Sequence, residues 1–146
     1  MSDILTRDDI RLGLSAADKA DALRQCGALL VDSGAATQAY AEALFDRERQ
    51  VSTYLGEGVA IPHGTNDSRE HILATKLGFL QFPDGVDWDG ETVHVCIPIA
   101  SQSDAHVDIL AALADVLMEP DSAQQLRTAT DPDAVLALLG AVSKEA

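Results

Sequence analysis

Residues 53–65 read Thr-Tyr-Leu-Gly-Glu-Gly-Val-Ala-Ile-Pro-His-Gly-Thr, an apolar run that ends at a proline and then presents a histidine before a glycine. Pro62 has no backbone N–H to donate to a neighbouring strand, and Gly64 can adopt backbone angles that are closed to other residues. We therefore expect the strand over Val59–Ile61 to end at Pro62, with His63 at the edge of a sheet. If the chain performs chemistry, we expect it at His63.

The overall composition is that of an ordinary globular protein. The chain has 146 residues, of which 47% are hydrophobic and 23% charged, enough for one domain spanning residues 1–146 with a sizeable buried core. No apolar run approaches the roughly 18 residues of a membrane span, and the N-terminus lacks the pattern of a signal peptide. We therefore expect a cytoplasmic protein in which Cys26 and Cys96 are buried thiols rather than a disulfide.

Acidic residues dominate the charge of the chain. The formal net charge is −14, and the ten Lys and Arg residues form no basic cluster. This disfavours nucleic acid and anionic membranes as main partners, because both bind through cationic patches. An acidic surface does suit a basic protein partner, whose encounter it speeds. Solubility alone, or a salt-adapted or GC-rich source, explains the same acidity, and both interpretations stay open.

Hydrophobic periodicity predicts strands that alternate with helices. The expected strands cover residues 9–14, 59–61, 74–82, 86–88 and 93–99. The first expected helix begins after an N-cap at Asp18 and ends at Gly34. The other expected helices cover residues 37–50, 105–118, 122–128 and 131–142.

Turn residues interrupt this alternation with one hairpin. Pro83-Asp84-Gly85 predicts a turn, and Asp89-Gly90 predicts the tight turn of a hairpin. We therefore predict an α/β fold, a three-layer sandwich with a mixed parallel/antiparallel sheet of about five strands flanked by helices on both faces.

Two of the four histidines follow predicted strands. His63 does so directly, and His106 opens a helix after the 93–99 strand, so both reach the same sheet edge if their strands are neighbours. His94 lies within a strand, and His71 ends a polar link with room for one helical turn. We expect structural or exposed roles for these two, which leaves His63 and His106 as the candidate functional histidines.

Common catalytic motifs are absent from the sequence. No His-Glu-x-x-His or Cys-x-x-Cys pair predicts a zinc site, no Gly-x-Ser-x-Gly elbow predicts an acyl-transfer serine, and no Walker A loop predicts nucleotide binding. What remains is a histidine that acts as nucleophile or as acid and base, since neutral imidazole is a competent nucleophile towards phosphorus. Metal-assisted hydrolysis by His63 and His106 with an aspartate is a further alternative.

Three short motifs carry a family resemblance. Asp46-Arg47-Glu48, Thr53-Tyr54-Leu55-Gly56 and Ile61-Pro62-His63-Gly64-Thr65 follow one another in this order. In order and spacing they resemble the mannitol/fructose-type enzyme IIA (EIIA) domain of the bacterial phosphoenolpyruvate:sugar phosphotransferase system. The strand from Val95 to Ala100, which leads to Asp104-Ala105-His106, is similar too, so the resemblance covers essentially the whole chain.

The resemblance implies a phosphotransferase component with a phosphohistidine intermediate. His63 matches the family's acceptor, which takes a phosphoryl group from the phosphocarrier protein HPr on Nε2 and passes it to a cysteine of the cognate enzyme IIB. Enzyme IIB then phosphorylates the sugar during its transport by the membrane component IIC. Arg47 and His106 match the family's active-site arginine and second active-site histidine. No metal and no nucleotide cofactor is implied.

Physical chemistry is consistent with these roles. Phosphoryl transfer needs in-line positioning and neutralised charge. Arg47 offers a planar cationic fork, and His106 brings a ring N–H together with the positive end of a helix dipole. Thr53 and the backbone around Gly64 can add neutral donors. Standing alone, Arg47 would instead pair with a neighbouring carboxylate and Thr53 would only satisfy a turn.

The partners follow from the implied relay. Two proteins must reach His63 in turn, so we expect an apolar collar that includes Leu55 and Val59. The motifs look closer to the mannitol branch than to the fructose branch, and the sugar is recognised by IIB and IIC rather than by this chain. An alternative is a regulatory phosphoprotein like the nitrogen-related EIIA branch, in which the phosphorylation of His63 controls binding to targets.

Overall fold

The computed structural model describes residues 4–101 and 105–140, and the side chains of residues 66 and 105–107 lie outside the described part. A mixed sheet in the strand order β1-β5-β6-β3-β2 forms its centre. The strands are β1 (Ile10–Arg11), β2 (Tyr54–Gly56), β3 (Val59–Ala60), β5 (Phe79–Trp88) and β6 (Glu91–Cys96). The pairs β1–β5 and β3–β6 are parallel, and the pairs β5–β6 and β2–β3 are antiparallel. Two further strands, β4 (Lys76–Leu77) and β7 (Ile99–Ala100), form an antiparallel pair of their own.

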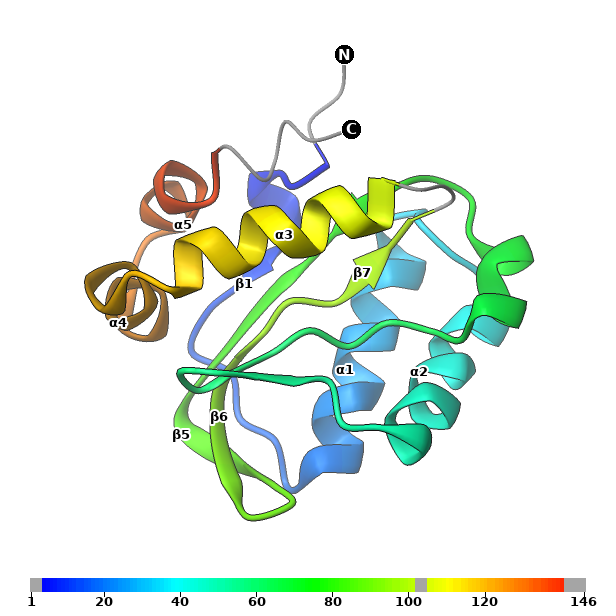
Figure 1. Ribbon diagram of the computed structural model, residues 1–146, viewed down its shortest axis with the longest axis horizontal. Coiled ribbons are helices and arrows are strands. Elements are labelled where there is room, and N and C mark those ends of the chain that lie inside the picture. Colours follow the sequence, from blue (N-terminus) through cyan, green and yellow to red (C-terminus); the bar gives the residue numbers. More distant parts are fainter. Residues whose placement is uncertain (1–3, 102–104, 141–146) are drawn as a thin grey trace.

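Helices cover both faces of the sheet (Figure 1). On one face lie α1 (Lys19–Asp32) and α2 (Gln38–Gln50). On the other lie α3 (Ala105–Leu117), α4 (Pro120–Thr128) and α5 (Pro132–Leu138). Two 3-10 helices, η1 (Arg7–Asp9) and η2 (Asn66–His71), complete the described elements, and η2 provides the helical turn expected in the polar link. The predicted three-layer α/β fold with a mixed sheet of about five strands is confirmed.

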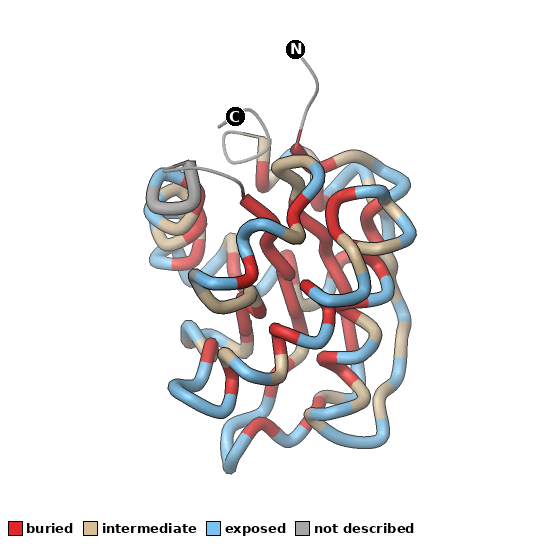
Figure 2. The backbone as a smooth tube through the Cα atoms, turned by 90° about the vertical axis from the view of Figure 1, so that its right-hand side faces the viewer, coloured by how far each residue is buried: buried red, intermediate tan, exposed pale blue. Residues whose placement is uncertain are grey.

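Alternation along the strands divides the interior into two cores. Successive strand residues point to opposite faces, so Val59 and Val95 pack towards α3, α4 and α5, whereas Ala60 and Cys96 pack towards α1 and α2. Figure 2 shows the resulting band of buried chain through the middle of the molecule. Cys96 and Cys26 are both buried and free, as the sequence predicts.

Local turn and cap signals have mixed outcomes. Asp18 caps α1 by accepting a hydrogen bond from the backbone of Asp21, as expected. The Asp89-Gly90 hairpin turn is also confirmed, with φ of 55° and 98°.

The turn predicted at Pro83-Asp84-Gly85 is wrong. Strand β5 continues through these residues, with a break in its register to β6 between Gln81 and Val86. A proline fits such a bulge because the ladder is locally interrupted, and Gly85 supplies a φ of +83°. The two long predicted strands are each split as well, at Gly78 and at Ile97-Pro98, and their outer parts become β4 and β7.

The pairing of β3 with β6 determines where the candidate site lies. Strand β3 runs parallel to β6, and the contact continues past both strands: Ile97 N–H donates to Ala60 O, and Ile99 N–H donates to Pro62 O, each at 2.9 Å. The chain entering His63 therefore lies directly beside β7. The condition under which His63 and His106 could reach the same sheet edge, that the strands before them are neighbours, is met by the pairing of β3 with β6.

Close packing of α1 against α2 gives the first prediction. A Cβ added to Gly27 would lie 2.7 Å from the Cβ of Ala41, so the helices would have to part. We predict that Gly27→Ala lowers the free energy of unfolding by about 1–3 kcal/mol, measured by chemical denaturation. Gly140→Ala is the control, because a Cβ there meets nothing within 4 Å. Equal stability of the two variants would contradict the prediction.

Candidate active site

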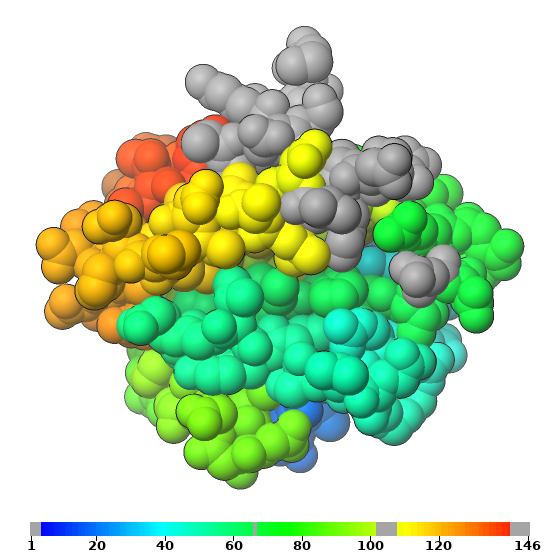
Figure 3. Space-filling model, viewed as in Figure 1, coloured from blue at the N-terminus to red at the C-terminus, as the bar shows by residue number. Residues whose placement is uncertain are grey.

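A cavity of about 510 Å³ opens where β3 ends. Among its lining residues are Arg47, Thr53, His63, Gly64, Arg69 and Ser101. It therefore brings together four of the five residues that the sequence predicts for the site. On the face shown in Figure 3, the teal surface of the β2–β3 region lies next to the yellow surface of α3, which contributes Leu110 to the cavity.

The fifth predicted residue is His106, in the first turn of α3. Its side chain lies outside the described part of the structure. Ser101 precedes it and Leu110 follows it in the chain, and both line the cavity. The role of His106 stays a prediction.

The ring of His63 is oriented by the backbone. Its Nδ1 lies 2.8 Å from the carbonyl oxygen of Ile61. Because a carbonyl oxygen can only accept, Nδ1 carries the proton, and the lone pair of the neutral ring is on Nε2. This geometry supports Nε2 as the nucleophilic atom.

Its surroundings keep His63 uncharged. Burial lowers the pKa of His63 below the usual histidine value. The hydrogen bond to Ile61 opposes this shift, the positive charge of Arg47 adds to it, and the carboxylate of Glu48 opposes it weakly. The net direction is downward, so the ring is neutral, and nucleophilic, at neutral pH.

Arg47 lies in the last turn of α2, half-buried at the wall of the cavity. Its guanidinium donates to the carbonyl oxygen of Val51 at 2.6 Å. The two acidic neighbours that the sequence offers as its partners are engaged elsewhere, since Asp46 pairs with Arg49 and Glu48 pairs with Lys19. The contact with Val51 holds the arginine at the end of its helix, close enough to His63 to affect its pKa.

The two predicted neutral donors are engaged within the protein. The hydroxyl of Thr53 donates to the carboxylate of Glu48, and the N–H of Gly64 donates to the hydroxyl of Tyr40 at 2.9 Å. Gly64 is not among the described glycines with positive φ, so the freedom of its backbone is not what makes glycine necessary there. Space requires glycine there, because a Cβ would lie 2.5 Å from Cε1 of Tyr40 and closer still to Oγ of Ser68.

Tyr40 is a site residue that the sequence does not reveal. Its buried hydroxyl donates to the carbonyl oxygen of Ile99 at 2.7 Å while accepting from Gly64. It therefore connects the loop after His63 to β7. As an apolar position on a predicted helix, Tyr40 looks like an ordinary core residue.

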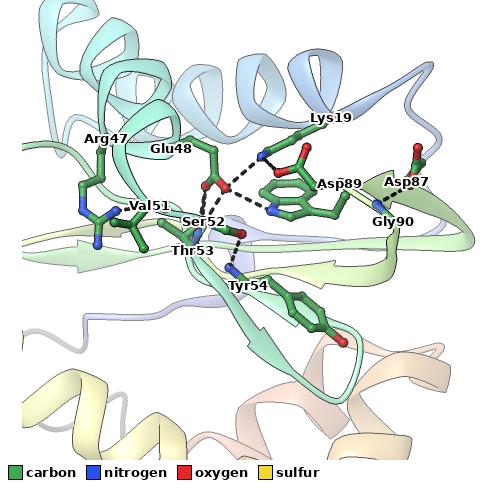
Figure 4. A network of polar contacts seen from close by, with 11 residues as sticks. Lys19, Arg47, Glu48, Val51, Ser52, Thr53, Tyr54, Asp87, Asp89 and Gly90 are labelled. Carbon is green, nitrogen blue, oxygen red and sulfur yellow. Dashed lines mark hydrogen bonds and ion pairs between the residues drawn. The ribbon is translucent and has the colours of Figure 1, made fainter.

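Glu48 is the second residue whose role the sequence does not reveal (Figure 4). Both of its carboxylate oxygens lie 3.1 Å from the N–H of Thr53, and the indole N–H of Trp88 donates to Oε2 at 3.2 Å. Lys19 completes the set with an ion pair at 3.0 Å and also binds Asp89 at 2.5 Å. Burial alone would raise the pKa of Glu48, but hydrogen bonds from Thr53 and Lys19 outweigh it, so the pKa is lowered. Trp88 is buried in the hairpin.

The apolar rim differs from the expected collar. Leu55 is 40% exposed and lines the cavity, but Val59 is fully buried and belongs to the core, because it sits on the inward side of a central strand. Val51, beside Arg47, is 64% exposed instead.

Among the described side chains, which exclude His106, no three His, Cys, Asp or Glu residues gather to hold a metal ion. Within the ranges 4–101 and 105–140, no helix is long and apolar enough to cross a bilayer.

A sequence comparison identifies the family of the chain. Residues 3–141 match the family described as "Phosphoenolpyruvate-dependent sugar phosphotransferase system, EIIA 2". The chain belongs to this family. The EIIA resemblance inferred from the three motifs is confirmed. The matched range includes all the residues that line the cavity.

Individual EIIA relatives are similar over most of the chain. The mannitol-specific phosphotransferase enzyme IIA component of Staphylococcus aureus strain Mu50 is 40% identical over 126 residues, which are 86% of this chain and 88% of that protein. A multiphosphoryl transfer protein of Escherichia coli O157:H7 is 44% identical over 136 residues, but this chain spans only 36% of its length.

A solved structure shows the same fold. It is the Escherichia coli complex of enzyme IIAMTL with phosphorylated enzyme IIBMTL, which matches with a TM-score of 0.88 and 34% identity. The match covers 94% of this chain and 97% of the other. The arrangement of sheet and helices is therefore shared with a mannitol-type EIIA.

The environment of His63 leads to a prediction about pH. Because its pKa is lowered, we expect the ring to titrate below the ordinary value of about 6.5, as measured by NMR of the ring protons. Arg47→Gln removes a positive charge and is expected to raise the pKa of His63. Arg49→Gln, whose side chain is exposed and paired with Asp46, is the control. A lower or unchanged His63 pKa in Arg47→Gln would contradict the prediction.

The contacts of Tyr40 give a prediction about the loop. Tyr40→Phe leaves the N–H of Gly64 and the carbonyl of Ile99 without the hydroxyl, which we expect to cost about 1–3 kcal/mol of unfolding free energy. Amide hydrogen exchange at Gly64 should become faster. Tyr54→Phe is a matched control, because the Tyr54 hydroxyl accepts from Gly58 instead. Unchanged exchange at Gly64 in Tyr40→Phe would show that the hydroxyl does not hold the loop.

Proposed function

We propose that this EIIA chain is a phosphoryl carrier. His63 accepts a phosphoryl group from phospho-HPr on Nε2 and passes it to the cysteine of a cognate enzyme IIB. The observation that carries the proposal is the hydrogen bond from Nδ1 to Ile61, which leaves Nε2 as the nucleophile within a cavity that contains an arginine. Membership of the EIIA family supports it.

The chemistry needs only this chain's own groups and the donor. The lone pair of Nε2 attacks phosphorus in line, an N–P bond forms, and the bond from phosphorus to the donor breaks with its electron pair left on the donor. The ring then carries a positive charge, because Nδ1 keeps its proton. The carbonyl of Ile61 accepts that proton's hydrogen bond throughout and so stabilises the charged ring. The second transfer reverses these steps, with a thiolate of enzyme IIB as the nucleophile.

Cationic groups at the cavity stabilise the transferred group. A phosphoryl group carries up to about two negative charges near neutral pH. Arg47 lines the cavity and its charge affects the pKa of His63, and Arg69 of η2 is a second arginine in the lining. We propose that His106 adds a donor from the first turn of α3. Thr53 and Gly64 support the site through Glu48 and Tyr40 rather than by binding phosphate directly.

Mannitol is the sugar that we propose for the pathway. The support is the 40% identity to the mannitol-specific component of S. aureus and the fold shared with the E. coli IIAMTL complex. That complex also contains phosphorylated IIBMTL, which supports a IIB-type protein as the phosphoryl acceptor. The exposed Leu55 and Val51 beside the cavity suit a transient protein interface.

Intact-mass measurement tests the proposal. After incubation with phosphoenolpyruvate, enzyme I and HPr, the wild-type chain should gain one acid-labile phosphoryl group of about 80 Da. His63→Ala should gain none. His71→Ala is the control, because His71 is a partly exposed residue of η2. The loaded chain should then phosphorylate a mannitol-type enzyme IIB.

Two outcomes would change this conclusion. No mass gain with a competent HPr, or a gain that persists in His63→Ala, would contradict the carrier role. Phosphorylation of His63 without transfer to any enzyme IIB would favour the regulatory function of the nitrogen-related branch.

A further inference from the structure

A buried carboxylate lies behind the cavity and has no part in the proposed transfer. The side chain of Glu48 is only 3% exposed, yet it is held by donors from three separate parts of the chain. Thr53 donates its N–H and its hydroxyl, Trp88 donates its indole N–H, and Lys19 provides a positive charge. Such a set of donors keeps the carboxylate ionised in the interior.

We propose that Glu48 is a positioning residue for phosphoryl transfer, because it fixes the turn that holds Arg47 and His63 relative to each other. This inference rests on the carrier function proposed above. Glu48 does not line the cavity that contains His63, and its side chain is buried. Its effect passes through Thr53, to which it makes three hydrogen bonds.

The first path runs from Thr53 to Arg47. Val51 lies two residues before Thr53, and its carbonyl oxygen accepts from the guanidinium of Arg47 at 2.6 Å. Its N–H in turn donates to the backbone carbonyl of Arg47 at 3.3 Å. The turn of residues 51–53 is thus tied to Arg47 at one end and to Glu48 at the other. A displacement of Thr53 moves the oxygen that holds the arginine.

The second path runs from Thr53 to His63. The carbonyl oxygen of Thr53 accepts from the N–H of Ile61 at 3.0 Å, and the carbonyl oxygen of Ile61 accepts from Nδ1 of His63 at 2.8 Å. One backbone hydrogen bond and one from the ring to a backbone carbonyl therefore connect the residue that Glu48 holds to the ring that accepts the phosphoryl group. The positions of Arg47 and His63 therefore both depend on the contact between Glu48 and Thr53.

Stability alone is a weak reason for a carboxylate at this position. Burying a charge is costly, and well-packed apolar residues often replace buried ion pairs with no loss of stability. What an apolar residue cannot do is accept hydrogen bonds from the turn. Transfer rates are sensitive to such placement, because a shift of about 1 Å in a reacting group can cost about 100-fold.

Glu48→Gln tests the inference in the full chain. Glutamine keeps the size of the side chain, but its amide NH₂ replaces an oxygen that faces donors. We expect the maximal rate of phosphoryl transfer from phospho-HPr to fall about 10-fold or more, with little change in the KM for phospho-HPr, since Glu48 is buried. Glu42→Gln, an exposed carboxylate on the same helix, should transfer at the wild-type rate.

Two further readouts separate positioning from a general structural role. Glu48→Gln should also lower the pKa of His63, because the carboxylate raises it in the wild type. In the double variant with Arg47→Gln, the rate loss should be smaller than the product of the two single losses, because the residues act through one turn.

Thr53→Val provides a second variant if Glu48→Gln folds poorly. It removes the hydroxyl bond to Glu48 while leaving the N–H contacts, and should lower the transfer rate in the same way. A folded Glu48→Gln or Thr53→Val protein that transfers at the wild-type rate, or fully multiplicative losses with Arg47→Gln, would overturn the inference. If the wild-type chain itself accepts no phosphoryl group, the proposed function fails instead.

Discussion

The parallel pairing of β3 with β6 is the constraint on which the arrangement of the site depends. Its hydrogen bonds continue beyond the strands to Pro62 and Ile99, so the segment that carries His63 leaves the sheet beside β7. The residues that line the cavity are positioned relative to this edge of the sheet, where the His63 segment lies beside β7. Tyr40 reaches it from α2, and the 51–53 turn reaches it through the backbone bond between Thr53 and Ile61. The sheet thus supplies a fixed backbone against which flexible side chains are oriented.

The charges of the site are organised by the same contacts. A cation and an anion lie next to each other in sequence at the end of α2, yet they do not neutralise one another. Arg47 donates to a backbone carbonyl, and Glu48 is satisfied by Thr53, Trp88 and Lys19. The result is a guanidinium on the cavity side and a compensated carboxylate behind it. For a protein with a formal net charge of −14, this separation is what makes the cavity suitable for an anionic group.

The sequence predicts the features that depend on neighbouring residues and misses those that depend on distant ones. The Asp18 cap and the Asp89-Gly90 hairpin follow from local chemistry and are confirmed, and β3 ends at Ala60, just before the proline that predicts its end. The bulge in β5 is missed, because Pro83-Asp84-Gly85 has the composition of a turn and only its pairing with β6 distinguishes the two. Tyr40 and Glu48 are missed because their decisive partners, Ile99 and Trp88, lie 59 and 40 residues away.

The two hydrogen bonds of the Tyr40 hydroxyl have a consequence for how a partner protein could distinguish the loaded from the empty state. The hydroxyl holds the loop after His63 to β7 as donor and acceptor at once, and neither of these hydrogen bonds involves the His63 ring. For the proposed carrier, phosphorylation of the ring would leave this anchor in place and add negative charge beside it. A partner that binds the loaded form would then need positive charge or hydrogen-bond donors that meet the added negative charge. Discrimination between the loaded and empty states would thus rest on electrostatics, without a mechanical switch.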